Sequence, residues 1–113
     1  MGQSEAAFQQ WCRIWFHNTY PALRGLLFHV RNNAHNSRDG QYWKELGVVA
    51  GVSDFIFLYA RRCHCIELKT LYGSQSDEQI DWEKLVTEQG IDYYIINTKE
   101  KFINLINKII NEG

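Results

Sequence analysis

The chain has 113 residues, of which 45% are apolar and 16 are aromatic, so it can close one compact core but not two. We therefore expect a single domain over residues 1–113, and because no apolar run of about 18 residues and no signal-peptide pattern occurs, we expect a cytoplasmic protein without a membrane partner. The net charge of −1 argues against binding nucleic acid through an overall positive charge. The charges are unevenly distributed: residues 1–75 carry eight basic and five acidic side chains, and residues 76–113 carry four basic and eight acidic ones. A polyanion would therefore contact the first part of the chain.

The first segment has the pattern of a helix. Ser4 can accept a hydrogen bond from a first turn, which places Glu5 in the opening turn. Apolar residues then recur at helical spacing until about His17, namely Phe8, Trp11, Cys12 and Trp15. Residues 18–25 include the only proline and end this helix.

A polar segment follows a short apolar one. Residues 26–30 predict a short buried strand, residues 32–40 an exposed loop, and residues 42–46 a short helix. Long polar loops on a compact domain often meet ligands. Arg31, Arg38 and Lys44 flank this loop or lie within it, and the sequence leaves open whether they contact phosphates or are solvated surface charges.

The middle of the chain predicts a hairpin. Beyond Gly51 a two-residue alternation predicts a central strand over residues 54–59, apolar on both faces but with an acid, Asp54, at its start. Arg61 and Arg62 mark the turn, and residues 63–70 form the returning strand. One face of that strand carries Cys63, Cys65, Glu67 and Lys69, and the other carries His64, Ile66 and Leu68.

The last third predicts helix, strand and helix. Ser76 and Gln79 form a capping-box pair that opens a helix to about Gln89, which Gly90 ends. Residues 92–97 predict a strand, and Thr98 can cap a final helix with a continuous apolar stripe (Phe102, Leu105, Ile106, Ile109 and Ile110). This order predicts an α/β domain with a central mixed sheet flanked by helices.

The feature that carries chemistry is the acid at the start of one central strand and the Glu-x-Lys triplet on its partner. In a tight hairpin Asp54 and Glu67 fall roughly opposite one another, and two close carboxylates repel unless a proton or a divalent cation lies between them. Mg²⁺ accepts two carboxylates and a carbonyl, for which Leu68 is placed. Lys69 shares the Glu67 face and can stabilise a phosphate whose charge grows. The arrangement suits phosphodiester hydrolysis.

These residues resemble the PD-(D/E)XK nuclease superfamily, and within it the VRR-NUC branch. The resemblance rests on residues 51–54, on the triplet at residues 67–69, on Ser76-x-x-Gln79 and on Glu5, and it spans nearly the whole chain. Two departures are Ser53, where the family usually has proline, and Arg31, which replaces the proline of the family's Val-Pro-Asn segment. Neither departure removes a metal ligand.

The resemblance implies a restriction-endonuclease-like core and a Mg²⁺- or Mn²⁺-dependent endonuclease. Asp54, Glu67, Glu5 and the Leu68 carbonyl would hold the metal, and Lys69 and Gln79 would complete the catalytic set. Free-standing members of this size resemble Holliday-junction resolvases, act as homodimers and cleave branched or flapped DNA. The expected partners are therefore branched DNA and a second copy, with Arg31, Arg38, Lys44 and Ser76 as nucleic-acid contacts.

Other readings of the same residues stay open at this point. The acids can be structural in a non-catalytic nucleic-acid-binding module, or the same scaffold can act on RNA. Cys63-His64-Cys65 suggests zinc, but alternation sends His64 to the opposite face and no second ligand pair follows, so three reduced cysteines are expected. His29 and His35 suggest an HNH-type nuclease, whose metal hairpin the sequence does not show.

Overall fold

The computed structural model describes residues 4–31 and 37–113, with the side chains of residues 37–39 excepted. Its elements run in the order α1 (Glu5–Thr19), η1 (Pro21–Leu23), β1 (Leu27–His29), α2 (Ser37–Glu45), β2 (Phe55–Tyr59), β3 (Arg62–Leu68), α3 (Asp77–Glu88), β4 (Asp92–Ile96) and α4 (Lys99–Glu112). The capped helices begin where the sequence predicts, because the side chains of Ser4, Ser76 and Thr98 each accept a backbone hydrogen bond from their first turns.

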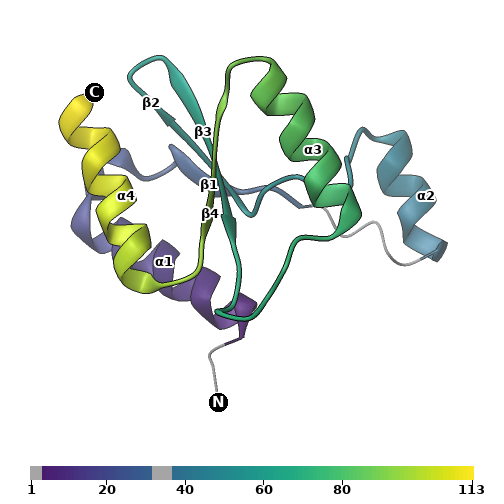
Figure 1. Cartoon of the computed structure of the whole chain (residues 1–113), viewed down its shortest axis with the longest axis horizontal. Helices are drawn as coiled ribbons and strands as arrows, with labels where there is room; N and C mark the ends of the chain where they lie inside the picture. Colours follow the sequence, from purple (N-terminus) through teal and green to yellow (C-terminus); the bar gives the residue numbers. More distant parts are fainter. Residues whose placement is uncertain (1–3, 32–36) are drawn as a thin grey trace.

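The four strands form one mixed sheet in the order β1-β2-β3-β4. The first two pairs are antiparallel and the β3–β4 pair is parallel, with α3 as the crossover. Helices lie on both sides of this sheet: Figure 1 shows α1 and α4 together on one side, α3 on the other, and α2 beyond α3. The predicted α/β fold with a mixed, helix-flanked sheet is therefore confirmed.

The core lies between α1, α4 and one face of the sheet. Alternation along β2 and β3 sends Phe55, Phe57, Ile66 and Leu68 to this face, where they are buried. The helices add Phe8, Cys12 and Phe16 from α1 and Phe102, Ile106 and Ile109 from α4, so the predicted apolar stripe packs as expected. Within the described residues no helix has the length and apolar character that crossing a membrane requires.

Two local predictions, the burial of β1 and the start of α2, were wrong. Strand β1 was predicted to be buried, but it lies at the edge of the sheet that the described residues form, and only Leu27 of its three residues is buried. Helix α2 begins at Ser37 and so takes up the end of the predicted loop, of which residues 32–36 lie outside the described part. Gly40 lies inside this helix, and glycine normally disfavours a helix interior, which hid the helix in the sequence.

The hairpin turn lies one residue earlier than predicted. Ala60 and Arg61 have φ of 52° and 67°, the left-handed conformation that two-residue hairpin turns need, and Arg62 already pairs with Tyr59. Because neither residue is the Gly or Asn that usually marks such a turn, the sequence signal was displaced. The register that results pairs Phe55 with Ile66 and so sets the acids at their final positions.

Candidate active site

The hairpin register brings the two predicted acids together. Since Phe55 pairs with Ile66, the next position outward places Asp54 opposite Glu67. The Asp54 carboxylate accepts a hydrogen bond from the backbone N–H of Leu68, with 2.6 Å between Oδ2 and N. Asp54 is thus fixed to the strand that carries the Glu-x-Lys triplet.

Glu67 is a buried acid with one unsatisfied oxygen. Its side chain is 0% exposed, and the Tyr93 hydroxyl donates a hydrogen bond to Oε1. Among the described residues, no group makes a hydrogen bond to Oε2. Buried polar atoms in folded proteins nearly always have a hydrogen-bond partner. An oxygen that lacks one among the described residues is therefore a candidate ligand for a bound group.

Burial raises the pKa of both carboxyl groups. For Glu67 the loss of solvent is the largest cause, and the nearby Asp54 charge adds to it, while Tyr93, Lys69 and the Gln75 amide oppose it. That amide donates its hydrogen bond of 2.8 Å to Glu83 and not to Glu67 Oε2. For Asp54 the loss of solvent again dominates, against the Leu68 N–H, His29 and Lys69. Two neighbouring carboxyl groups with raised pKa are a setting in which a bound cation would stabilise the charged forms.

Lys69 is held between two helices. Its ammonium donates a hydrogen bond to Gln79 Oε1 on α3 over 2.9 Å, and it lies 3.9 Å from Glu5 Oε1 on α1. The same Gln79 oxygen accepts the backbone N–H of Ser76 over 2.8 Å as half of the α3 capping box. Gln79 therefore serves the helix cap and the lysine with one atom, the capping-box role from the sequence and the contact with Lys69.

Gly51 lets α3 approach this site. Its φ is 87°, and a Cβ built there would lie 2.2 Å from the carbonyl oxygen of Glu78 and 2.9 Å from the amide nitrogen of Gln79. Any side chain at this position would collide with the first turn of α3. The glycine in the sequence pattern before Asp54 therefore has a physical reason, which is backbone contact with the helix that carries Gln79.

An open cleft of roughly 630 Å³ lies beside this site, and Glu67 is buried behind it rather than among its lining residues. Asp54, Lys69, Ser76 and Gln79 line it, and Lys44 on α2 lies on its wall. Of the other predicted nucleic-acid contacts, Arg31 is not among the residues that line this cleft. The Arg31 guanidinium stacks 4.1 Å above the Trp43 ring centroid, and the Arg38 side chain lies outside the described residues.

Two residues of this site were missed from the sequence. Tyr93, which holds Glu67, comes from β4, and alternation alone could have assigned it to the face opposite the core but not to its partner. His29, interpreted as an ordinary loop or packing histidine, places its ring nitrogen Nδ1 2.7 Å from the Asp54 carbonyl, to which it donates. It supports the backbone of Asp54 from β1.

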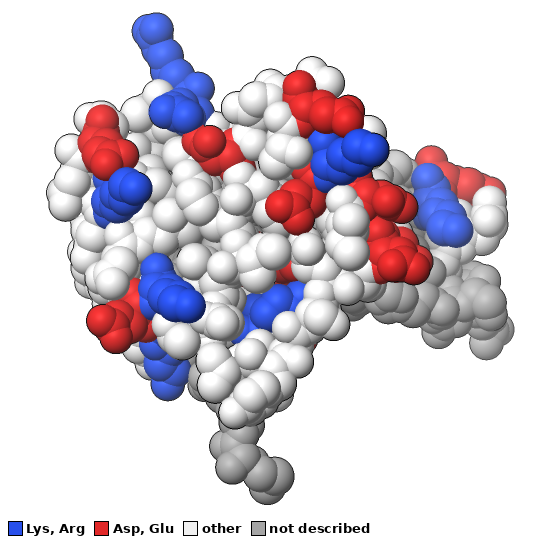
Figure 2. Space-filling model, in the orientation of Figure 1, with Lys and Arg blue, Asp and Glu red and all other residues white. Residues whose placement is uncertain are grey.

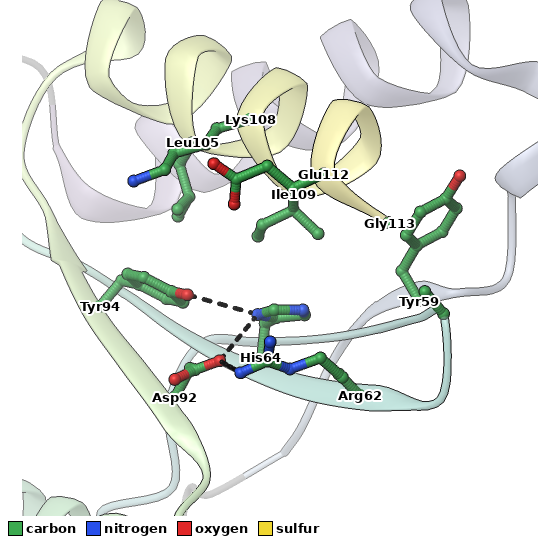
Figure 3. Close-up of a pocket in the computed structure, with 11 residues that line it drawn as sticks. Tyr59, Arg62, His64, Asp92, Tyr94, Leu105, Lys108, Ile109, Glu112 and Gly113 are labelled. Carbon is green, nitrogen blue, oxygen red and sulfur yellow. Dashed lines mark hydrogen bonds and ion pairs between the residues drawn. The ribbon is translucent and has the colours of Figure 1, made fainter.

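The Cys-x-Cys segment lies near the start of β3, away from Glu67 at the other end of the strand. Cys63 and Cys65 are free thiols, and His64 lies on the opposite face as alternation predicts. Figure 3 shows His64 within a separate cavity of roughly 270 Å³ beneath α4, with Asp92 and Tyr94 at one edge of its ring. The Nδ1 atom lies 3.7 Å from Asp92 Oδ2 and 3.4 Å from the Tyr94 oxygen, and Arg62 pairs with Asp92 at 2.7 Å.

The donor set suits a hard divalent cation. Within the described part of the chain, no three His, Cys, Asp or Glu side chains converge on a common point, so the acidic share of a site here is two carboxylates. Mg²⁺ and Mn²⁺ prefer oxygen ligands, and Mg²⁺ keeps several waters, so two carboxylates with a backbone carbonyl are sufficient. The unsatisfied Oε2 of Glu67 opposite Asp54 fits this requirement.

Comparison with known proteins places the fold. No protein-family model and no curated protein matches the chain. A solved structure described as a VRR_NUC domain protein is similar to it with a TM-score of 0.83 and 20% sequence identity, over 100% of this chain and 93% of that one. The chain thus has the fold that the VRR-NUC resemblance implied, and this likeness runs from end to end.

Proposed function

We propose that this chain is a Mg²⁺- or Mn²⁺-dependent endonuclease that hydrolyses DNA phosphodiester bonds. The observation that carries the proposal is the buried Glu67 with its unsatisfied oxygen, opposite Asp54 and next to Lys69 on one strand. A structural acid in a core is expected to have its hydrogen bonds satisfied. A carboxylate that binds a cation can instead leave an oxygen without a hydrogen bond when no ion is present, and this difference favours a catalytic role over a purely structural one.

Asp54 and Glu67 would hold the metal, with the Leu68 carbonyl as a further ligand. Glu5, which the resemblance implies as another ligand, does not converge with these two acids and lies 3.9 Å from the Lys69 ammonium, where it would help to hold the lysine. When bound, the ion lowers the pKa of a coordinated water and offsets negative charge on the phosphate. Lys69 contributes a fixed positive charge, and its ammonium can donate to a phosphate oxygen. Gln79 orients Lys69 from α3, while Tyr93 and His29 hold Glu67 and the Asp54 backbone.

The charge distribution restricts how a nucleic acid can approach. Acidic side chains gather over α3 in Figure 2, and this helix carries Asp77, Glu78, Asp81, Glu83 and Glu88. A polyanion would avoid that surface and reach Lys69 from the side of α2 and the N-terminal turn of α1. Lys44, Arg31 and Ser76 are the contacts we assign to it on this side, and Arg38, whose side chain lies outside the described residues, stays a predicted contact.

The preferred substrate in this proposal is branched DNA, such as a flap or a four-way junction, cut by a homodimer. Branch selectivity rests on the resemblance to free-standing VRR-NUC proteins. Pairing has support from the exposed outer face of the sheet, where Phe28 is 40% and Leu58 42% exposed, since apolar patches often mark protein contacts. A monomeric mass at micromolar concentration in solution would defeat the dimer.

The experiment compares cleavage of labelled duplex, flap and four-way-junction DNA with Mg²⁺, Mn²⁺ or EDTA. Asp54→Asn, Glu67→Gln and Lys69→Met should each lower the rate by about 100-fold or more, as loss of transition-state stabilising groups typically does. Lys84→Met and Glu88→Gln repeat the same chemical changes on the exposed surface of α3 and should cut like wild type.

The outcomes separate the rival functions. Metal-dependent products that disappear in the three site variants support the endonuclease. Binding that survives Asp54→Asn, with no product on any substrate or metal, would replace it with a non-catalytic binding module. Cleavage of RNA of the same structures in preference to DNA would move the activity to RNA on the same scaffold.

A further inference from the structure

The loop that follows β3 and Lys69 carries an exposed aromatic residue, Tyr72. Tyr72 is 95% exposed and Leu71 61% exposed, three and two residues beyond Lys69. They are held in a turn, because the N–H of Gly73 donates to the carbonyl of Thr70 over 2.9 Å. An exposed tyrosine ring on an ordered turn beside a candidate active site is suited to stack on a ligand with a flat, apolar face.

A groove of roughly 600 Å³ lies next to this turn. Leu71 and Tyr72 line one side of it, Phe8 comes from α1, and Asn97 to Lys99 come from the start of α4. Phe8, Leu71 and Tyr72 give this groove an apolar wall, whereas Asp54, Lys69 and Gln79 line the cleft at the candidate active site. We call it the Tyr72 groove.

The groove and the catalytic cleft lie on two sides of one loop. The stretch that follows Lys69 lines the groove with residues 70–72 and the cleft with residues 74–76. On α1, Phe8 of the groove is about one helical turn from Glu5, whose carboxylate oxygen is 3.9 Å from the Lys69 ammonium. A chain held at Lys69 can therefore continue into the groove.

The charge of the groove suits a phosphate-bearing ligand. None of the described residues that line it is acidic, and Lys99 contributes an ammonium that lies 4.9 Å from the Trp11 ring centroid. The surface of α3, by contrast, is acidic (Figure 2). The apolar walls, the exposed ring and the single cation together match a nucleotide, with its base against Tyr72 and its phosphate near Lys99.

We propose that the Tyr72 groove binds an unpaired nucleotide of the strand whose phosphate lies at Lys69, with the base stacked on Tyr72. The inference rests on the proposed nuclease function for its substrate. It makes Tyr72 a positioning residue that favours DNA with unpaired bases near the cut, because a base inside a duplex already stacks on its neighbours and is not free to stack on Tyr72.

The test uses the full chain in EDTA and flap DNA with 2-aminopurine at the unpaired position next to the branch. Stacking on Tyr72 should quench the fluorescence, and Tyr72→Ala should abolish the quench and weaken flap binding by about ten-fold, the usual scale for one base–aromatic stack. Tyr72→Phe keeps the aromatic face and should behave like wild type. Leu85→Ala removes a leucine on α3 that is as exposed as Leu71 and should change neither readout.

A second arm measures cleavage with Mg²⁺. Tyr72→Ala should lower the flap rate by about ten-fold and change the rate on fully paired DNA by no more than about two-fold. Equal losses on both substrates, or an unchanged flap quench and rate, would overturn the inference and leave the nuclease proposal standing. A Tyr72-dependent quench by a protein that cuts nothing would keep the groove and defeat the nuclease. A change in oligomeric mass on Tyr72→Ala without any change in DNA binding would assign the groove to a second copy instead.

Discussion

Replacing Glu67 by glutamine should stabilise the protein in the absence of metal while abolishing its activity. The variant keeps the shape of the side chain and an oxygen that can accept the Tyr93 hydroxyl, but it removes a negative charge from a site that is 0% exposed. In wild type that charge is desolvated, lies opposite Asp54 and has one oxygen without a hydrogen bond among the described residues. Glutamine removes the charge and the repulsion together.

The size of the effect follows from the unsatisfied oxygen. Leaving a buried charged group partly unsatisfied costs about 3 kcal/mol, and the glutamine amide, which takes the same place without a partner, costs about 1 to 2 kcal/mol. The difference predicts a gain of about 1 to 2 kcal/mol in the free energy of unfolding, or about 4 to 8 °C in melting temperature for a domain of this size.

The pH dependence of this gain has a definite sign. The pKa of Glu67 in the folded protein is raised above its ordinary value of 4.5, so the folded state holds the proton more tightly than the unfolded state does. Wild type therefore loses stability as the pH rises from about 4.5 through the folded pKa, whereas the glutamine variant has no such proton to release. The advantage of Glu67→Gln should be present at pH 7.5 and should vanish near pH 4.5.

Calorimetric melting in EDTA and in Mg²⁺ tests this reasoning. Mg²⁺ at about 100 times its dissociation constant should stabilise wild type by about 2.7 kcal/mol and leave Glu67→Gln unchanged, which reverses the order of the two proteins. Glu88→Gln makes the same change on the exposed end of α3 and should shift stability by less than about 0.5 kcal/mol. A lower melting temperature for Glu67→Gln in EDTA would refute the argument, because it would show that the fold already compensates the charge.

Three further predictions use matched variants. Gly51→Ala and Gly25→Ala both add a side chain at positive φ, but only Gly51 faces backbone within 3 Å, so Gly51→Ala should cost at least about 2 kcal/mol more in chemical unfolding and should lower cleavage. Ser76→Ala and Ser4→Ala should each cost about 1 kcal/mol as lost caps, yet Ser76→Ala should lower the cleavage rate more because its cap contains Gln79. Burial lowers the pKa of His64, so wild type should lose stability as the pH falls below about 6.5, and His64→Gln should lose less between pH 7 and 5 in urea titrations.

Local rules explain most of what the sequence could predict. Serine and threonine caps fixed the starts of α1, α3 and α4, and helical or two-residue periodicity assigned the buried faces of α4, β2 and β3. The meeting of Asp54 and Glu67 was predictable for the same reason, since a tight hairpin determines its own register to within a residue or two. These features depend on residues close together in the chain.

Contacts between distant segments explain what the sequence could not predict. Tyr93 meets Glu67 through the parallel β3–β4 register, which depends on how α3 crosses over and not on any turn. His29 reaches the Asp54 carbonyl through the β1–β2 pairing, across the polar segment that precedes β2. The edge position of β1 likewise depends on the sheet order, for which a three-residue strand carries no signal.

The way helix α3 is held in place explains why energetically unfavourable features lie together at one end of the sheet. None of its described side chains is buried, so the usual apolar packing contributes little to its position. Its N-terminal turn is instead held against Gly51 and by the hydrogen bond from Lys69 to Gln79, while Trp82 contacts Tyr93 on β4. The groups that position the helix are therefore the groups that line the candidate active site. A positive φ, an unsatisfied carboxylate and a lysine held by a capping residue are each unfavourable or specialised when considered alone, and their convergence at one cleft is what a site selected for chemistry rather than for stability would produce.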